Sequence, residues 1–387
     1  MALSFALSEK QEQLRGTVRR FATEEVGPRA RDLNTAGEFP LDLVHRMGEL
    51  GLLGLPFPPE DGGAGADLLT FCLAVEEVGR VDQSLGITLE SAVILGGMPL
   101  VRFGTEEQKR RWLPPLVRGE RVAGFGLTEP TGGTDAAGLR TRATLDGDEW
   151  VIDGGKAFIG NAGTPVTSHV VITAITGERD GRHEITNLLV PAGAPGFVAH
   201  ERNRLVGWHA IDNRHLTFDG CRVPVGNQLG QRGQGLANFL SVLDQGRVAI
   251  AALAVGLIQG CLDECVAYAA RRHAFGSPIG AHQAIAFKIA DLQVAAQTAR
   301  DATWRAAWLH DQRRPYRREA SVAKLYATEG AVTAAREACQ VFGGLGFTTD
   351  QPVGRFYQDA KVLEVGEGTS EVQRLLIARA LGLPEPR

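Results

Sequence analysis

The sequence predicts an α+β fold that is mostly helical and is divided into three domains. Helical periodicity dominates residues 1–121 and 233–387, whereas residues 122–232 show turn signals between short apolar runs without intervening helices. We therefore expect an N-terminal helical domain, a small central antiparallel β-domain and a C-terminal four-helix bundle domain with these boundaries. The chain has 387 residues, 44% hydrophobic and 22% charged, which is typical of a soluble globular protein.

Helix-capping patterns mark the N-terminal domain. Ser8 with Gln11 and Thr105 with Gln108 have the spacing of a capping box. Asp67 precedes an apolar run and is expected to cap a further helix. No segment in this part alternates as a half-buried strand would, so the domain is predicted to be helical.

Turn signals identify the strands of the central domain. Asp146-Gly147 and Asp153-Gly154 are dipeptides typical of tight turns, and both are expected to join strands. The segments SHVVITAIT and NLLVPA are predicted to be further strands, with GAPG as a loop. Several short strands in succession favour an antiparallel sheet.

Long helices are expected in the C-terminal domain. The apolar period that starts at Gly235 predicts one helix that reaches about His273. A second helix is expected to begin near Ile285, and a third to cover Val322–Val341. Helices with such broad apolar faces pack as a bundle.

Composition excludes several classes of partner and location. The net charge of −4 gives no electrostatic footprint for nucleic acid or for an anionic membrane. The longest apolar stretch, Val248–Ile258, is too short to span a bilayer, and the N-terminus lacks the regions of a signal peptide. Cys261 and Cys265 have no accompanying histidine, so no metal site is expected. We expect a cytoplasmic protein with buried, reduced thiols.

Common cofactor and nucleophile motifs are absent, among them GxGxxG, GxxxxGK(S/T), HExxH and GxSxG. Two glycine-rich segments, 126–135 and 340–347, offer backbone N–H groups that suit a phosphate or a flat ring. An ordinary turn would explain the first segment equally well, and a helix cap would explain the second. Glu367 lies between two glycines before an apolar helix that Thr369 is expected to cap. From this position it could be a solvated loop residue or point into a pocket.

Together these segments resemble the acyl-CoA dehydrogenase family, flavoenzymes that convert acyl thioesters to 2,3-enoyl thioesters. GLTEPTGGTDAAG matches the family's first signature, and QVFGGLGFTTDQPVGRFYQD matches the second, including Asp350, Arg355 and Asp359. EGTSE stands where the family places its catalytic glutamate, and the order of helices, sheet and helices is that of the family. The resemblance covers essentially the whole chain and implies FAD as cofactor and an acyl-CoA as substrate.

The resemblance implies that Glu367 is the catalytic base that takes the α-proton, while the β-hydride goes to flavin N5. Burial beneath a fatty chain is expected to raise the pKa of Glu367, and the nearby helix N-terminus to lower it. Some related enzymes carry the base at the position of Gly246, which leaves Glu367 as the candidate here. Glu90 resembles a residue at the far end of the acyl pocket. The substrate-binding positions that the resemblance implies are Thr134, Asp244, Arg247, Gly368 and Glu90.

The resemblance also implies that each FAD site is shared between subunits. The positions that match contacts to FAD within one subunit are Phe125, Leu127, Thr128, Thr134, Phe158, Gly160, Thr369 and Glu371. The positions that match contacts to the FAD of a neighbouring subunit are Arg272, Phe275, Gln283, Gln340, Gly343 and Gly344. Shared sites imply an obligate homo-oligomer, usually a tetramer built as a dimer of dimers.

Three positions depart from the family's pattern. Phe158 and Gly160 stand where the family usually has a tryptophan and a Thr or Ser beside the flavin, so a hydrogen bond near N5 is lost. Gly366 replaces the aromatic residue that commonly precedes the base. This glycine either opens room for a branched or bulky acyl group or is refilled by its neighbours. The arginine that reads a second carboxylate in the glutaryl-CoA branch has no counterpart between Ser84 and Glu90, which disfavours dicarboxylic substrates.

The leading hypothesis is an FAD-dependent acyl-CoA dehydrogenase of fatty acid or branched-chain acyl catabolism. It would act on short, medium or branched chains and pass electrons to an electron-transferring flavoprotein. Two alternatives are an acyl-CoA oxidase that uses O₂ and a dehydrogenase of acyl groups bound to a carrier protein. A non-enzymatic flavin-binding scaffold is disfavoured, because the glutamate at position 367 is intact.

Overall fold

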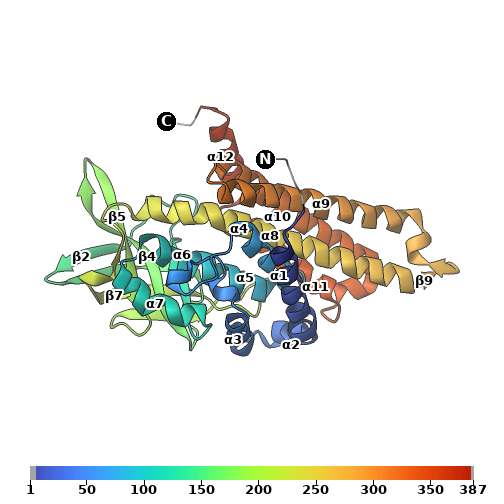
Figure 1. The fold of residues 1–387 in the computed structure, drawn as a ribbon, viewed down its shortest axis with the longest axis horizontal. Coiled ribbons are helices and arrows are strands. Elements are labelled where there is room, and N and C mark those ends of the chain that lie inside the picture. Colours follow the sequence, from blue (N-terminus) through green and yellow to red (C-terminus); the bar gives the residue numbers. More distant parts are fainter. Residues whose placement is uncertain (1–5, 385–387) are drawn as a thin grey trace.

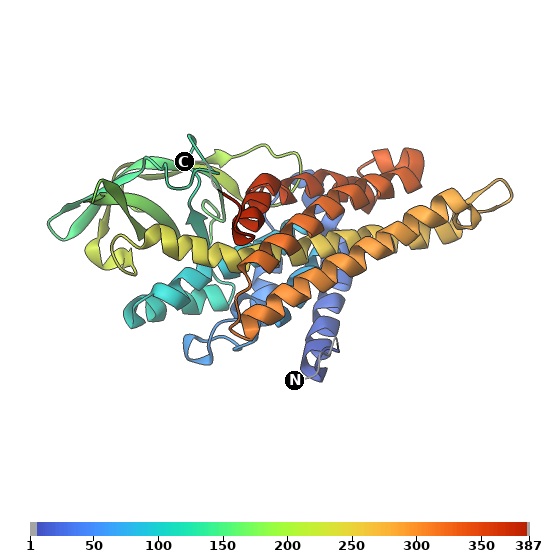
Figure 2. The same cartoon turned by 90° about the horizontal axis from the view of Figure 1, so that it is seen from above.

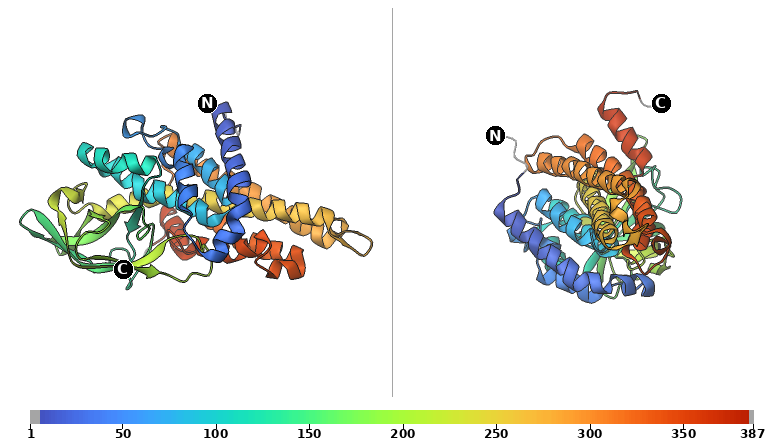
Figure 3. Two further views of the ribbon diagram at one scale, coloured as in Figure 1. Left: turned by 90° about the horizontal axis from the view of Figure 1, so that it is seen from below. Right: turned by 90° about the vertical axis from the view of Figure 1, so that its right-hand side faces the viewer.

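The computed structural model describes residues 6–384 and has a sheet region at one end of an elongated helical body (Figure 1). One helix, α8 (Gly235–Arg271), starts beside the sheet and runs through the helical body to a short hairpin at the opposite end (Figure 2). Its fully buried middle section gives the molecule a continuous apolar core that both helical regions share. Viewed along its length, α8 lies among the surrounding helices (Figure 3).

The N-terminal region is helical, as the sequence predicts. Both expected capping boxes, at Ser8 and Thr105, are formed, and Asp67 accepts a hydrogen bond from the backbone of Thr70 at 2.8 Å. The helices are α1 (Glu9–Arg20), α2 (Gly27–Ala36), α3 (Leu41–Glu49), α4 (Leu68–Gly79), α5 (Gln83–Glu90), α6 (Met98–Phe103) and α7 (Glu106–Val117), with π-helical turns at Phe21–Val26 and Ser91–Gly97.

The central sheet has the strand order β6-β7-β3-β2-β4-β5-β8, with β1 beside β4. Neighbouring strands are antiparallel, as expected, except that β4 runs parallel to β1 and β2. Bulges shift the register between β3 and β7 and between β4 and β5, so these long strands bend without ending. The strands are β1 (Val122–Gly126), β2 (Arg142–Asp146), β3 (Glu149–Gly160), β4 (Thr167–Arg179), β5 (Arg182–Pro191), β6 (Phe197–Arg202), β7 (Asn213–Pro224) and β8 (Gln228–Leu229).

One of the two expected turns is wrong. Asp146-Gly147 lies at the turn between β2 and β3, but Asp153-Gly154 lies inside β3. Gly154 has φ +138°, and the pairing of β3 with β7 shifts register beside it. A Cβ at Gly154 would lie 2.7 Å from the Cα of Thr141. This glycine therefore marks a bulge and a close approach of two backbones, which the dipeptide pattern alone cannot distinguish from a turn.

The C-terminal region is a bundle in which α8, α9 and α10 pack against one another and α11 packs on α8 and α10. The helix starting at Gly235 ends close to the predicted His273. Two helical stretches, Gln83–Phe103 and Gly235–Arg271, have the length and apolarity to cross a membrane, but 72% and 83% of their most apolar windows are buried in the protein. The remaining elements are β9 (His273–Ala274), β10 (Ser277–Pro278), α9 (Gln283–Asp311), α10 (Arg317–Phe342), α11 (Pro352–Leu363) and α12 (Ser370–Ala380).

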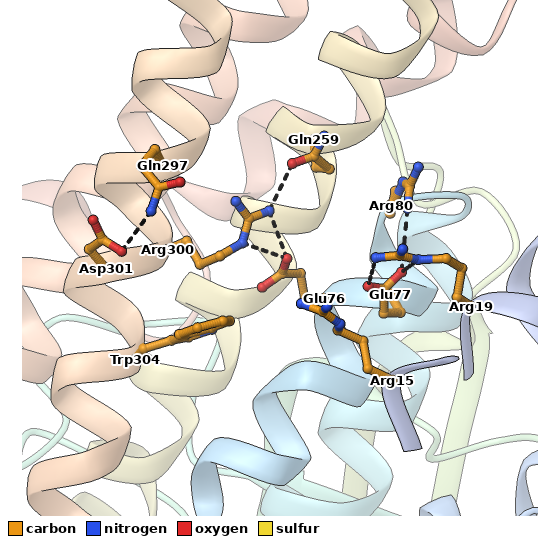
Figure 4. A pocket seen from close by; sticks show the side chains of 10 residues that line it. All are labelled: Arg15, Arg19, Glu76, Glu77, Arg80, Gln259, Gln297, Arg300, Asp301 and Trp304. Carbon is orange, nitrogen blue, oxygen red and sulfur yellow. Dashed lines mark hydrogen bonds and ion pairs between the residues drawn. The ribbon is translucent and has the colours of Figure 1, made fainter. Parts of the chain in front are cut away.

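A polar cavity of about 560 Å³ lies between the N-terminal helices and the bundle (Figure 4). Its charges are paired: Arg19 of α1 bonds Glu77 of α4 within the N-terminal helices, and Arg300 of α9 bonds Glu76 of α4 across the junction at 2.8 Å. None of its lining residues belongs to the site that the sequence predicts. We interpret this cavity as a structural ion-pair network that joins the two helical regions.

Candidate active site

The loop between α11 and α12 carries Glu367 in a left-handed conformation. Glu367 has φ +54° and Gly368 has φ +96°. A side chain at position 368 would be strained and would approach the Gln373 amide nitrogen to 2.8 Å, so this position requires glycine. Thr369 caps α12, as predicted, by accepting a hydrogen bond from the backbone of Val372 at 3.3 Å. The backbone reversal directs the Glu367 side chain into the protein, where both carboxyl oxygens are buried.

The Glu367 carboxyl group lies against α8 at Gly246. A Cβ at Gly246 would overlap the Oε2 atom of Glu367, so the absence of a side chain there is what makes room for the carboxyl. Position 246 is the one that carries the base in some relatives of the resembled family. It lies beside the Glu367 carboxyl, so the two alternative positions of the base meet at one place in the structure.

Glu90, at the end of α5, has its carboxyl beside that of Glu367. Its expected place at the far end of an acyl pocket stays a prediction. Glu90 is fully buried, and when ionised neither carboxyl has a donor among residues 6–384. A proton on Glu90 supplies a hydrogen bond between the two groups. Position along α5 could not reveal this contact, which depends on how the loop at residue 367 folds back.

Burial dominates the protonation of this pair. It raises the pKa of Glu367 to about 7, although the bond to Glu90 and the charges of Arg247 and Lys324 act in the opposite direction. Burial and the neighbouring Glu367 raise the pKa of Glu90 well above its usual range, so Glu90 keeps the proton. Of the two effects expected at Glu367, burial therefore wins.

Two further predicted residues lie on α8 next to Gly246. Asp244 accepts hydrogen bonds from Arg247 at 2.6 Å and from Arg317 at 2.5 Å. The Nε atom of Arg247 is buried and has no partner among the described residues. A buried guanidinium with an unused donor is costly unless a ligand completes its bonding, so Arg247 is suited to hold a polar group of the substrate.

The sheet reaches the same place through a direct contact. Asn161, which follows Gly160, donates a hydrogen bond to the Ser91 hydroxyl at 3.0 Å, and Ser91 follows Glu90. Phe125 at the end of β1 stacks on Phe239 of α8 with ring centres 3.8 Å apart. The N-terminal helices, the sheet and the bundle therefore meet around Glu367.

Of the residues implied to bind FAD within the subunit, those from 125 to 160 belong to the sheet region, whereas Thr369 and Glu371 lie at the start of α12. The Thr128 carbonyl bonds the backbone of Ala157 at 2.9 Å, which sets it beside Phe158. Phe158 is 61% exposed and has φ +60°, an uncommon conformation for an aromatic residue. Thr134 lies in an exposed loop, and a Cβ at Gly132 would meet only one atom, at 3.8 Å. Exposed aromatic and hydroxyl groups around open space fit a flavin dinucleotide.

The residues implied to contact a neighbour's FAD gather at the opposite end of α8 (Figure 2). Tyr268 of α8 stacks on Phe342 of α10 with ring centres 4.1 Å apart, which brings the β9–β10 hairpin and the end of α10 together. Phe275 is 97% exposed, and a Cβ at Gly343 or Gly344 would meet nothing within 4 Å. The set brought together is Arg272, Phe275, Gln283, Gln340, Gly343 and Gly344. At about 1.5 Å per residue, α8 separates this set from Gly246 by nearly 40 Å.

Sequence reasoning missed two side chains that support the Glu367 loop. Lys324 of α10 donates to the Gly368 carbonyl at 2.9 Å, and Gln373 of α12 donates to the same carbonyl at 2.9 Å. A signal for Lys324 was present, since it occupies the alanine-rich face of α10 that turns out to be buried. Gln373 gave no comparable signal.

Comparison with known proteins agrees with this geometry. Family models match in the order of the chain: the N-terminal domain of acyl-CoA dehydrogenase over residues 8–120, the middle domain over 124–221 and the C-terminal domain over 233–382. A probable acyl-CoA dehydrogenase of Bacillus subtilis, YngJ, is 45% identical over 98% of this chain and 100% of its own. The short-chain specific acyl-CoA dehydrogenase of rat mitochondria is 40% identical over 97% and 90%.

Solved structures match as closely. Butyryl-CoA dehydrogenase from Megasphaera elsdenii superposes with a TM-score of 0.94 at 35% identity, covering 98% of this chain and 100% of the other. A structure described for the electron transferring flavoprotein of Acidaminococcus fermentans superposes with a TM-score of 0.95 at 38% identity, covering 98% and 99%. With three domains matched in order and the Glu367 carboxyl buried against α8, the chain belongs to the acyl-CoA dehydrogenase family and is an FAD-dependent acyl-CoA dehydrogenase.

Proposed function

We propose that Glu367 is the general base of this acyl-CoA dehydrogenase and that the substrate is a short straight-chain acyl-CoA. The observation that carries the first part is a buried carboxyl group whose pKa lies at about 7, set between Gly246, Glu90 and Arg247. A base that titrates near neutrality is ionised often enough to act and basic enough to take a weakly acidic proton. The second part is supported by the short-chain and butyryl-CoA specificities in the names of the relatives.

In the proposed reaction the Glu367 carboxylate takes the α-proton of the thioester, so the bond from the α-carbon to hydrogen breaks and an O–H bond forms. Bound FAD supplies the acceptor for the β-hydride, so that the acyl chain is oxidised to the 2-enoyl thioester and the flavin is reduced. Arg247 offers its unused Nε–H to a polar atom of the substrate. Burial of the site keeps water from the carboxylate while the proton moves.

We also propose that the enzyme is a homo-oligomer with shared FAD sites, and that an electron-transferring flavoprotein reoxidises it. The exposed hairpin with Phe275, nearly 40 Å of helix away from the subunit's own base, supports the first proposal, because it is too distant to serve that site. The similarity to a structure described for an electron transferring flavoprotein supports the second.

Anaerobic titration of the FAD-loaded enzyme with acyl-CoAs tests the proposed function. Butyryl-CoA is expected to bleach the flavin absorption faster than octanoyl-CoA or isobutyryl-CoA. Glu367→Gln should retain FAD but lose bleaching by a factor of about 10³ or more, since the amide cannot take a proton. The matched control is Glu120→Gln, which changes an exposed carboxylate that pairs with Arg118 at the end of α7.

Wild-type bleaching by Glu367→Gln would overturn the assignment of the base. Faster bleaching by octanoyl-CoA or isobutyryl-CoA would overturn the assignment of chain length while leaving the base in place. Glu120→Gln is expected to bleach at the wild-type rate.

A further inference from the structure

Lys324 is a lysine in an unusual place. It lies in the middle of α10 with a relative exposure of 0%. Lysine is almost never fully buried in proteins without a paired carboxylate. The residues that surround it on the same buried face of the helix are Ala320, Ala323, Ala327 and Ala331. These small side chains leave room for the long lysine side chain on the buried face of the helix.

The lysine ends on the backbone of the Glu367 loop. Its Nζ donates to the Gly368 carbonyl at 2.9 Å, and the Gln373 side chain donates to the same oxygen at 2.9 Å and to the Glu367 carbonyl at 3.4 Å. Two donors from two helices therefore bond the carbonyl oxygen of Gly368, the residue that follows Glu367. The left-handed conformation of Glu367 costs on the order of 1 kcal/mol or more, so it persists only where the surroundings hold it.

No ion pair explains the burial of the charge. Within residues 6–384, no carboxylate oxygen lies within ion-pair distance of Lys324, and the Gly368 carbonyl is its one hydrogen-bond acceptor. A hydrocarbon side chain would fill the same space without the desolvation cost of an ammonium group. The buried charge of Lys324 therefore does not serve an ion pair that stabilises the fold, and we look for a role that depends on the charge itself.

The charges around the loop indicate that role. Glu367 is faced by Glu90 from α5, by Arg247 from α8 and by Lys324 from α10. Lys324 is faced in addition by the more distant Glu364 and Glu329. Burial lowers the pKa of Lys324 to about 8, so the ammonium is still mostly charged at pH 7, where Glu367 is half ionised. The positive charge favours the carboxylate form of Glu367 without forming a bond that would block it.

We propose that Lys324 is a positioning residue for the base: its ammonium group fixes the Gly368 carbonyl so that the Glu367 carboxyl stays over Gly246, and its charge keeps that carboxyl ionised. Lys324 acts through Glu367 and does not touch the reacting atoms. The inference rests on the proposed role of Glu367 as base.

Three variants of the FAD-loaded enzyme separate the bond from the charge. Lys324→Met removes both, Lys324→Gln keeps an N–H donor without the charge, and Gln373→Leu removes a neutral donor. The measurement is the rate of flavin bleaching by butyryl-CoA as a function of pH, together with the dissociation constant for butyryl-CoA. Lys109→Met, which removes a lysine of α7 that pairs with Asp61, is the matched control.

The two roles predict different changes. Lys324→Met should slow bleaching at pH 7 by about tenfold or more and move the rising limb of the pH profile up by about 1 unit, because the carboxylate loses a nearby positive charge. Lys324→Gln should recover most of the limiting rate at high pH but keep the shifted limb. Gln373→Leu should lower the limiting rate and leave the limb in place. Substrate affinity should change little in all three variants.

Wild-type profiles for both Lys324 variants would overturn the inference. So would a lower rate with an unshifted limb, since a purely structural lysine would give that result. If Lys324→Met fails to fold or to hold FAD, Lys324→Gln decides, and a limb at its wild-type position overturns the proposal. Failure of Glu367 as base is recognised separately, because Glu367→Gln would then bleach normally whatever the Lys324 variants do.

Discussion

Among residues 6–384, two lysines are completely buried, one in the sheet and one in the bundle, and they are bonded very differently. Lys156 of β3 donates to Glu129 at 2.8 Å, to the Thr173 hydroxyl at 3.1 Å and to the Leu127 carbonyl at 3.4 Å. Lys324 has one acceptor, on the loop of the base. Burial lowers the pKa of both lysines to about 8. Equal burial thus serves two purposes: the sheet lysine satisfies all its protons and joins strands, whereas the bundle lysine leaves its charge available to a neighbour.

Removing the sheet lysine should give the largest effect and would test this contrast directly. Lys156→Met leaves Glu129 buried without its cation, and the free energy of unfolding is expected to fall by about 3–5 kcal/mol. Lys324→Met leaves no carboxylate without an ion-pair partner and should lower stability far less. Urea denaturation of both variants measures the difference. Equal losses of stability in the two variants would mean that Lys324 also serves mainly to stabilise the fold.

Substitution of Gly246 should give the next largest effect, on the rate of the reaction instead of on the stability of the protein. In Gly246→Ala the new methyl group overlaps the Glu367 carboxyl and must displace it, and a displacement of about 1 Å can cost about 100-fold in rate. The measurement is the rate of flavin bleaching by butyryl-CoA. Gly16→Ala on α1, where a Cβ meets nothing within 4 Å, is the control and should keep the wild-type rate. An unchanged rate in Gly246→Ala would show that the base has room to move.

The smallest expected effect concerns the proton on Glu90. Loss of the Glu90 hydrogen bond destabilises the Glu367 carboxylate, so the pKa of Glu367 should rise from about 7 and the rising limb of the pH profile should move to higher pH. Glu90→Leu should show this shift, of up to about 1 unit, whereas Glu90→Gln keeps a donor and should show little of it. A shift toward lower pH in Glu90→Leu would mean that Glu90 is ionised and repels the base.

Local patterns explain which parts of the structure the sequence could predict. The caps at Ser8, Asp67, Thr105 and Thr369 depend on neighbours within three residues, and all four are formed. The turn expected at Asp153-Gly154 was wrong, because Gly154 is needed where the backbone of Thr141 approaches it closely. Fold class was accessible because the change from helical to strand periodicity is long and repeated.

The candidate site was accessible in part for the same reason. Glu367 could be found because a motif surrounds it, whereas its contact with Glu90 joins residues from opposite ends of the chain. Lys324 was missed because a charged residue within a helical period is ordinarily assigned to the solvent side. Its alanine neighbours at helical spacing were the sign that the polar side chain faces inward.

The length of α8 also fixes the distance between Gly246 and the β9–β10 hairpin. The helix carries Gly246 about a third of the way along and leads to the exposed hairpin at its end. A single helix therefore sets the distance between the subunit's proposed base and the groups that it is proposed to offer to a neighbour. Inserting one residue between Gly246 and the hairpin would lengthen this distance by about 1.5 Å and rotate the hairpin by about 100° about the helix axis. The hairpin would then face away from the site it is proposed to complete. Insertions that surface loops absorb are therefore expected to be excluded from this one helix.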